Sequence, residues 1–267
     1  MKMTPEHLLT SKSRTVTQRI NEFNIDLFRT KGGRLGSGMG LLLEGLWGYM
    51  MNKELEHESL SVAWIVDHSY NDFAVVNGIE EWDPQSRKNE VFRIEIKSMN
   101  LGADESKAHF DPITPEIGVD DQLVVLAWEW AADNGWMWPR VRETYLGPAR
   151  KIAELRDELH LARGGFFVDR KSCPDGCEPK VCSHHGEPLN ASGKRERLSG
   201  PESTRVSRGV SHAANFGGLV RMIKVRGPDA RTRLERVMAE SPEARSYVDF
   251  IVRIGNGSTQ AIEVDTQ

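Results

Sequence analysis

The sequence has few cysteines, no long apolar run and no excess of positive charge. Its three cysteines, among 267 residues, all lie between Cys173 and Cys182, and an odd number argues against a disulfide framework. No run approaches the roughly 20 apolar residues that a membrane helix requires. The N-terminus leads into no apolar core of the kind found in signal peptides. These absences predict a soluble cytoplasmic protein without a membrane partner.

Apolar content and local charge give the first positive indications. Hydrophobic residues make up 39% of the chain and include seven tryptophans, which is enough for the core of one large domain with an insertion. The net charge of −4 hides a basic region, because Lys194–Arg236 holds 11 Lys and Arg against four Asp and Glu, or 11 − 4 = +7. Such a region can bind phosphates, although a solvated helix face has the same composition.

The segment Val91–Asn100 carries the strongest local pattern. Apolar and polar side chains alternate from Phe92 to Ile96, which predicts a strand with one buried face. Glu95 and Lys97 then share the opposite, polar face. A carboxylate and an ammonium placed two residues apart form either a surface ion pair or half of a metal-dependent phosphodiesterase site.

Two further acids precede this strand. A helix is predicted from Met39 to Glu54 and is apolar nearly all round, so it should be largely buried, with Glu44 inside it. A buried carboxylate is costly unless it is paired or binds a cation. Asp72 begins one strand of a hairpin predicted from Ser61–Val66 and Asp72–Asn77. The alternative for Glu44 is a position at the helix edge.

The remaining pattern predicts the organisation of the chain. Residues 1–163 are expected to hold a helical lead-in and the core that contains Glu44, Asp72, Glu95 and Lys97, 164–211 an insertion, and 212–267 a C-terminal α/β segment. The other predicted elements are a helix near Asp104–Phe110, strands at Asp120–Glu129 and Trp136–Tyr145, helices at Pro148–Arg163 and Pro228–Ala239, and strands at Tyr247–Ile254 and Gln260–Val264.

Glu44, Asp72, Glu95 and Lys97 are the residue types that phosphodiester hydrolysis uses. Mg²⁺ prefers carboxylate oxygens and retained waters, and a nearby lysine can stabilise charge on phosphate. Their order, on a helix, a hairpin and a Glu-x-Lys strand, resembles the PD-(D/E)xK nucleases of the restriction-endonuclease-like superfamily. The resemblance covers about residues 36–145. It departs at Asn71, where the family has proline.

The resemblance implies a fold, a reaction and partners. It implies an α/β core with a central mixed sheet flanked by helices, acting on double-stranded DNA. Asp72 and Glu95 would hold Mg²⁺, Lys97 would orient or activate water, and Glu44 would support the metal or its waters. A sequence-specific type II restriction enzyme, active as a homodimer, is the leading expectation within the family. A repair or phage-defence nuclease of the same fold is the alternative.

The cysteines predict a second metal. Short spacing suits tetrahedral Zn²⁺, bound by Cys173, Cys177, Cys182 and either His184 or His185. Free thiols beside incidental histidines are the alternative reading. The cluster lies where large apolar side chains are scarce, so a structural role is expected. DNA contacts are predicted in the basic flank, at Lys194, Arg195, Arg197, Arg205 and Arg208. A zinc-dependent DNA-binding protein without catalysis is the competing function.

Overall fold

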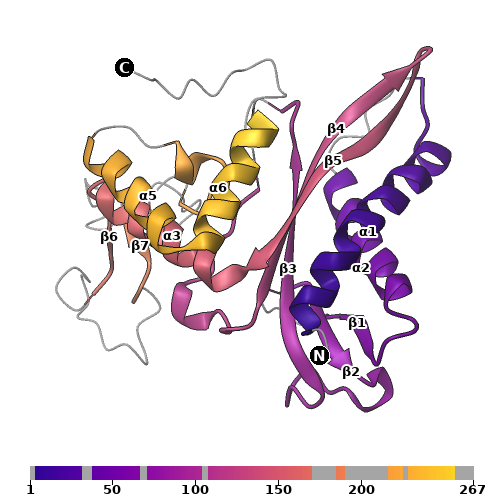
Figure 1. Ribbon diagram of the computed structural model, residues 1–267, viewed down its shortest axis with the longest axis horizontal. Coiled ribbons are helices and arrows are strands. Elements are labelled where there is room, and N and C mark those ends of the chain that lie inside the picture. Colours follow the sequence, from indigo (N-terminus) through magenta and orange to yellow (C-terminus); the bar gives the residue numbers. More distant parts are fainter. Residues whose placement is uncertain are drawn as a thin grey trace, which may run out of the picture. The chain divides into compact units, whose positions relative to one another are not determined.

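The computed structural model describes seven stretches of the chain: 4–31, 38–66, 71–103, 108–169, 185–189, 216–224 and 228–255. They form an α/β structure whose main sheet has five strands (Figure 1). None of the described helices is long and apolar enough to cross a bilayer. Close contacts divide the chain into two units, described separately below: 1–108 with 117–150 and 246–267, and 109–116 with 151–245. The boundaries expected at 163 and 211 remain predictions.

The five-stranded sheet belongs to the first unit and is mixed. Its spatial order follows the chain order, and every neighbouring pair is antiparallel except β3 and β4, which run parallel. The strands are β1 (Leu60–Trp64), β2 (Phe73–Asn77), β3 (Glu90–Asn100), β4 (Gln122–Asp133) and β5 (Trp136–Pro148). All five strands predicted in this region are therefore confirmed, together with the hairpin.

The parallel pair requires a crossover between β3 and β4, and its form differs from the prediction. The helix expected near Asp104–Phe110 is absent at Ala108–Phe110, which is non-helical, whereas 104–107 lie outside the described residues. A 3-10 turn at Thr114–Glu116 is the helical element of this connection in its described part. Two prolines, Pro112 and Pro115, interrupt the segment and disfavour a longer helix.

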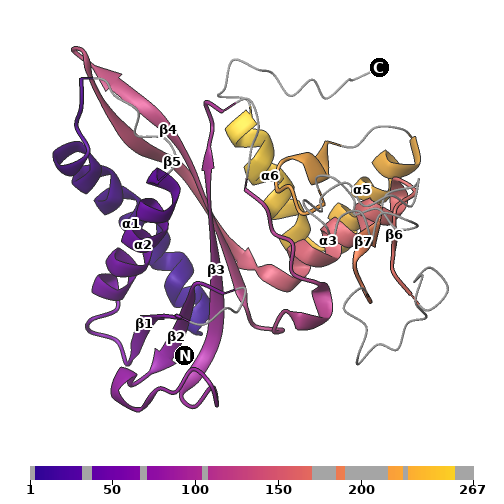
Figure 2. The same cartoon turned by 180° about the vertical axis from the view of Figure 1, so that it is seen from behind.

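Two helices pack on one face of this sheet (Figure 2). Helix α1 (Pro5–Leu27) starts at Thr4, whose hydroxyl oxygen accepts a hydrogen bond from the backbone N–H of His7, and Pro5 follows at the first helical position. Its Asn21 and Asn24 side chains bond to backbone groups of β5, so α1 satisfies the free edge of that strand. The helical lead-in predicted for this region is confirmed.

Helix α2 (Met39–Glu54) has the predicted bounds but only part of the predicted burial. Leu43, Trp47 and Met51 are fully buried, whereas Leu41 and Leu42 are at least half exposed. The expectation that this helix is largely buried holds for the side that faces the sheet and fails for the outer side, because α2 lies in an outer layer. Gly48 lies at a close approach between α2 and β2, where a Cβ would come within 2.3 Å of the Phe73 ring.

The second face of the sheet is also buried, which corrects the expectation of one buried face for β3. Arg93 and Glu95 are only 3% and 4% exposed. Helix α6 (Pro242–Gly255) packs on this side of β5, where Tyr145 contacts Tyr247 and Phe250. The predicted strand at Tyr247–Ile254 is therefore wrong, and the strand expected at Gln260–Val264 lies outside the described residues.

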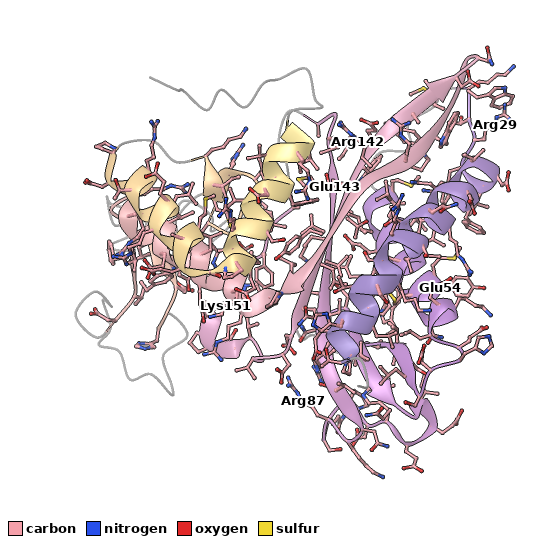
Figure 3. The ribbon with its side chains drawn as sticks, in the orientation of Figure 1. Arg29, Glu54, Arg87, Arg142, Glu143 and Lys151 are labelled. Carbon is pink, nitrogen blue, oxygen red and sulfur yellow. The ribbon has the colours of Figure 1, made fainter. Side chains whose placement is uncertain are left out.

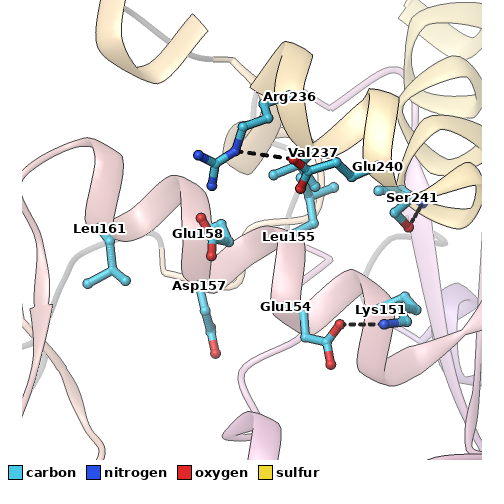
Figure 4. Close-up of a pocket in the computed structure, with 11 residues that line it drawn as sticks. Lys151, Glu154, Leu155, Asp157, Glu158, Leu161, Arg236, Val237, Glu240 and Ser241 are labelled. Carbon is cyan, nitrogen blue, oxygen red and sulfur yellow. Dashed lines mark hydrogen bonds and ion pairs between the residues drawn. The ribbon is translucent and has the colours of Figure 1, made fainter. Parts of the chain in front are cut away.

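The second unit contains helices α3 (Ala149–Ala162, from Lys151 on) and α5 (Pro228–Glu240), with the short strands β6 (Phe166–Phe167) and β7 (Pro188–Leu189). Both helices were predicted. Within this unit Arg156 is buried, donates to the carbonyl of Phe110 and lies over the Phe216 ring. An open groove between α3 and α5 carries paired charges, including Lys151 with Glu154 and Arg236 with Glu240 (Figure 4).

Candidate active site

The candidate site lies in the first unit, where one edge of β3 loses its strand partner. On that edge β2 pairs with β3 only from Glu90 to Ile94, because β2 begins at Phe73. On the opposite edge, β4 continues to pair up to Asn100. The backbone N–H groups of β3 beyond Ile94 would therefore lack acceptors on the open edge unless other groups supplied them.

Two carboxylates supply these acceptors. Asp72 Oδ2 accepts a hydrogen bond from the Ile96 backbone N–H at 2.8 Å, and Glu44 Oε1 accepts from the Ser98 N–H at 2.9 Å. These donors alternate along the strand and so lie roughly 7 Å apart. A helix residue and a hairpin residue are thus brought to consecutive positions on one strand edge. The structure brings Glu44 and Asp72 together with β3, as the sequence predicted.

Glu95 and Lys97 complete the group on β3 itself. The ammonium of Lys97 forms an ion pair and hydrogen bond with Glu95 Oε1. The Glu95 side chain is 5% exposed and that of Lys97 27% exposed, so solvent reaches the pair mainly from the lysine end. Glu95 Oε2 is buried and has no hydrogen-bond partner. A buried carboxylate oxygen left without a partner is costly, which favours a cation at this position.

The three carboxylates and the lysine interact electrostatically. Burial raises the pKa of Glu95 to about 8, with Asp72 and Glu44 adding to the effect and Lys97 opposing it. Burial also raises the pKa of Glu44, and Lys97 again opposes the shift. Burial lowers the pKa of Lys97, but the three carboxylates Glu95, Asp72 and Glu44 together raise it by more. The pKa of Lys97 therefore lies above its ordinary value.

The charge of the site favours a divalent cation. When a bound cation keeps Glu95 ionised, three carboxylates and one ammonium leave 3 − 1 = 2 negative charges for that cation to balance. No group of three or more His, Cys, Asp and Glu in the described stretches is arranged as a metal cluster. Mg²⁺ needs less, because one or two carboxylates with retained waters suffice. Asp72 and Glu95, with the unpartnered Glu95 Oε2, fit that smaller requirement.

No family model, curated protein or solved structure matches this sequence. The chemistry of the site therefore has to be inferred from its own residues. The structure does contain the pattern predicted from the sequence. Its members are a glutamate on a helix, an aspartate on a hairpin and a Glu-x-Lys strand, and the four side chains interact around one strand edge.

Sequence reasoning missed two residues beside the site. Ser98 holds Glu44 through its backbone N–H and its hydroxyl, and Gly40 approaches that hydroxyl so closely that a Cβ would lie 2.5 Å from it. Asn71 is 3% exposed, and neither polar atom of its side chain has a hydrogen-bond partner. The sequence did show one signal for Asn71, namely that it is a polar residue directly before Asp72. Nothing in the local pattern indicated Ser98.

The predicted zinc and DNA-binding residues lie almost wholly outside the described part of the chain. Only His185, an exposed residue in a turn, is described among the zinc candidates. The remaining residues, for which the predictions stand as made, are Cys173, Cys177, Cys182 and His184 for zinc and Lys194, Arg195, Arg197, Arg205 and Arg208 for DNA.

Proposed function

We propose that this protein is a Mg²⁺-dependent endonuclease that hydrolyses phosphodiester bonds of double-stranded DNA, with a restriction-endonuclease-like core. The observation that supports the proposal is the convergence of Glu44, Asp72, Glu95 and Lys97 at the open edge of β3. Among nucleases of this class, a sequence-specific type II restriction enzyme acting as a homodimer is the form we favour.

Each residue has a distinct role in this proposal. Asp72 and Glu95 would hold the metal, and a bound Mg²⁺ would polarise a phosphoryl oxygen and acidify an attacking water. Lys97, already next to Glu95, orients that water and places positive charge where negative charge develops on the phosphate. Glu44 ties α2 to Ser98 and presents its carboxylate to the metal or to its water shell.

The fold holds these groups rigidly. Ile94 and Ile96 flank Glu95 along the strand and are both fully buried against α1 and α2. The Asp72 and Glu44 bonds to Ile96 and Ser98 fix the other two carboxylates to the same strand. Preorganised charges of this kind lower a barrier more than mobile ones, because no reorganisation is needed during the reaction.

The test is cleavage of supercoiled plasmid DNA with Mg²⁺ and with EDTA by the parent, Asp72→Asn and Lys97→Ala. We expect the parent to cleave only with Mg²⁺, and each variant to lose at least about a hundredfold in rate. Asp72→Asn keeps an oxygen that can accept from the Ile96 N–H while removing the charge. It should therefore remain folded, which thermal unfolding can check.

Glu56→Gln is the matched control for Asp72→Asn. It removes one carboxylate charge from an exposed ion pair with Lys53, next to α2, and should cleave like the parent. Undiminished cleavage by Asp72→Asn and Lys97→Ala would refute the site assignment. A parent that binds diverse DNA tightly but never cleaves it would instead favour the binding protein without catalysis.

Recognition is assigned to the region after Gly164. Cys173, Cys177, Cys182 and His184 or His185 would hold a structural Zn²⁺, and the basic flank from Lys194 to Arg208 would contact DNA. What supports this part is the spacing of the cysteines and the local charge in the sequence.

A further inference from the structure

The strands β4 and β5 continue as a two-stranded ribbon beyond the rest of the sheet (Figure 1). The last β3–β4 pair joins Asn100 and Trp128, whereas β4–β5 pairing runs on to Asp133 and Trp136. The turn between them, Asn134–Gly135, has positive φ at both residues (49° and 78°). This is the backbone of a tight two-residue hairpin turn, which twists with the strands and gives the ribbon a defined end.

Two cations are fixed to the end of this ribbon. After α1, Thr30 exchanges both backbone hydrogen bonds with Met137 of β5, at 2.9 and 2.7 Å. Arg29 and Lys31 flank Thr30 in this extended segment. Their side chains therefore point to the same face, opposite to the Thr30 side chain. Their charged groups are 4.6 and 4.7 Å from the centre of the Trp136 ring. Figure 3 shows Arg29 at the ribbon end.

These two cations lack compensating acids. Both are exposed, and neither forms an ion pair with a carboxylate in the stretches that the structure describes. Further along the ribbon, Arg140 and Arg142 share the single carboxylate of Glu129. Four cations against Glu129 and Asp133 give 4 − 2 = +2 on a protein whose net charge is −4. Such a patch attracts a polyanion.

The ribbon cations and the candidate active site lie on the same face of the sheet. Lys97 pairs in register with Val125, and side chains alternate along β4, so Glu129 and Asp133 point to the face of Lys97. Their partners on β5 are Arg140 and Trp136. From Val125 to Asp133 the strand rises roughly 26 Å, which is the length of about eight base pairs of duplex.

We propose that Arg29 and Lys31, which lie over the Trp136 ring, form with Arg140 of the same ribbon a surface that contacts the phosphate backbone of double-stranded DNA. The inference rests on the proposed function, since the duplex held here is the one presented to Glu95 and Lys97. The cations fix position along the backbone and carry no sequence preference. Trp136 serves as the platform that keeps the Arg29 and Lys31 side chains ordered.

The test is DNA binding by the full chain, measured as fluorescence anisotropy of a labelled duplex of mixed sequence in EDTA at several salt concentrations. We expect the double variant Arg29→Ala with Lys31→Ala to raise Kd about tenfold. We also expect it to reduce the slope of log K against log salt by about two, since two phosphate contacts are lost. Both side chains are exposed, so the variant should fold normally, as circular dichroism can verify.

The matched control is Arg19→Ala with Lys53→Ala. It removes the same two residue types and the same charge from α1 and α2, but each of those cations already pairs with a carboxylate, Glu54 or Glu56. The control should bind DNA like the parent. Equal Kd and salt slope for the two double variants, or a parent that does not bind duplex DNA, would overturn the inference.

Binding in EDTA keeps this result separate from cleavage. A ribbon variant that loses affinity, in a protein that never cleaves, would support the surface and reject the nuclease. Cleavage and binding by the ribbon variant at the parent's rate and Kd would leave the nuclease standing and reject the surface. A duplex-specific contact also predicts a smaller loss for a single strand of the same sequence, whereas an equal loss on both would reject the assignment to duplex DNA.

Discussion

Asp72 and Glu44 serve both the fold and the candidate site. Each carboxylate replaces a missing strand partner by accepting a backbone N–H of β3, and this bond fixes where its charge lies. The residue types and their order could be predicted from the sequence, because Glu-x-Lys on an alternating strand and an acid at a hairpin start are local patterns. The open edge of β3, and hence Ser98, could not, since it depends on where β2 begins.

Gly48 on α2 allows Phe73 to pack beside Asp72. A Cβ at position 48 would lie 2.3 Å from two atoms of the Phe73 ring, which is itself 3% exposed between Trp47 and Trp64. We predict that Gly48→Ala destabilises the protein by about 1–3 kcal/mol, because the ring has little room to move. Equilibrium unfolding in urea measures this difference.

Gly45→Ala in the same helix is the control for that prediction. A Cβ there would come no closer than 3.2 Å, to the exposed Trp64 ring. Alanine also favours a helix over glycine by roughly 1 kcal/mol, and this gain offsets the close contact. The Gly45 variant should therefore be about as stable as the parent. If Gly48→Ala were as stable as Gly45→Ala, the close packing of Phe73 on α2 would be contradicted.

At the scale of elements, sequence periodicity identified five strands and four helices but failed at α6. The segment Tyr247–Ile254 is rich in β-branched and aromatic residues, which favoured a strand. Its buried positions instead follow a helical repeat, namely Ala244, Tyr247, Val248, Phe250, Ile251 and Ile254. Extending the window back to Ser241 and Pro242, which are typical of a helix start, would have given the correct element.

The start of α6 gives a prediction about that element. Ser241 Oγ accepts a hydrogen bond from the Ala244 N–H at 3.1 Å, satisfying one of the free donors of the first turn. Ser241→Ala should therefore cost about 1 kcal/mol of unfolding free energy in a denaturant titration. Ser246→Ala, an exposed serine in the interior of the same helix, should be neutral or slightly stabilising. Equal effects at the two serines would argue against the cap.

At the scale of the whole molecule, the sequence predicted an α/β class and a mixed sheet but not how the sheet is covered. Arg93 and Glu95 looked solvent-facing because charged residues usually are. Both faces of β3 are buried in the structure, and this burial raises the pKa of Glu95. Helix α6, more than 140 positions after β3, packs on this face of the sheet at Tyr145 of β5, which no local pattern around β3 could indicate.

The proposed function would depend on two metals, one for cleavage and one for folding stability. Mg²⁺ at Asp72 and Glu95 would serve cleavage, whereas Zn²⁺ at the cysteine cluster would stabilise a region poor in apolar side chains. We predict that the purified protein contains about one zinc per chain by elemental analysis. Removing the zinc with a strong chelator should lower the melting temperature. Zn²⁺ should restore the melting temperature and Mg²⁺ should not, because thiolates are poor ligands for Mg²⁺.

Variants separate the two dependences. Cys177→Ser should lose zinc and melt at a lower temperature, whereas His57→Gln, which lies outside the cluster, should keep both zinc and stability. Asp72→Asn should keep zinc while losing Mg²⁺-dependent cleavage. A folded, zinc-free preparation that melts like the untreated protein would refute the zinc site. It would leave the Mg²⁺ site untouched, because the described contacts that hold Glu44, Asp72, Glu95 and Lys97 come from α2, the hairpin and β3.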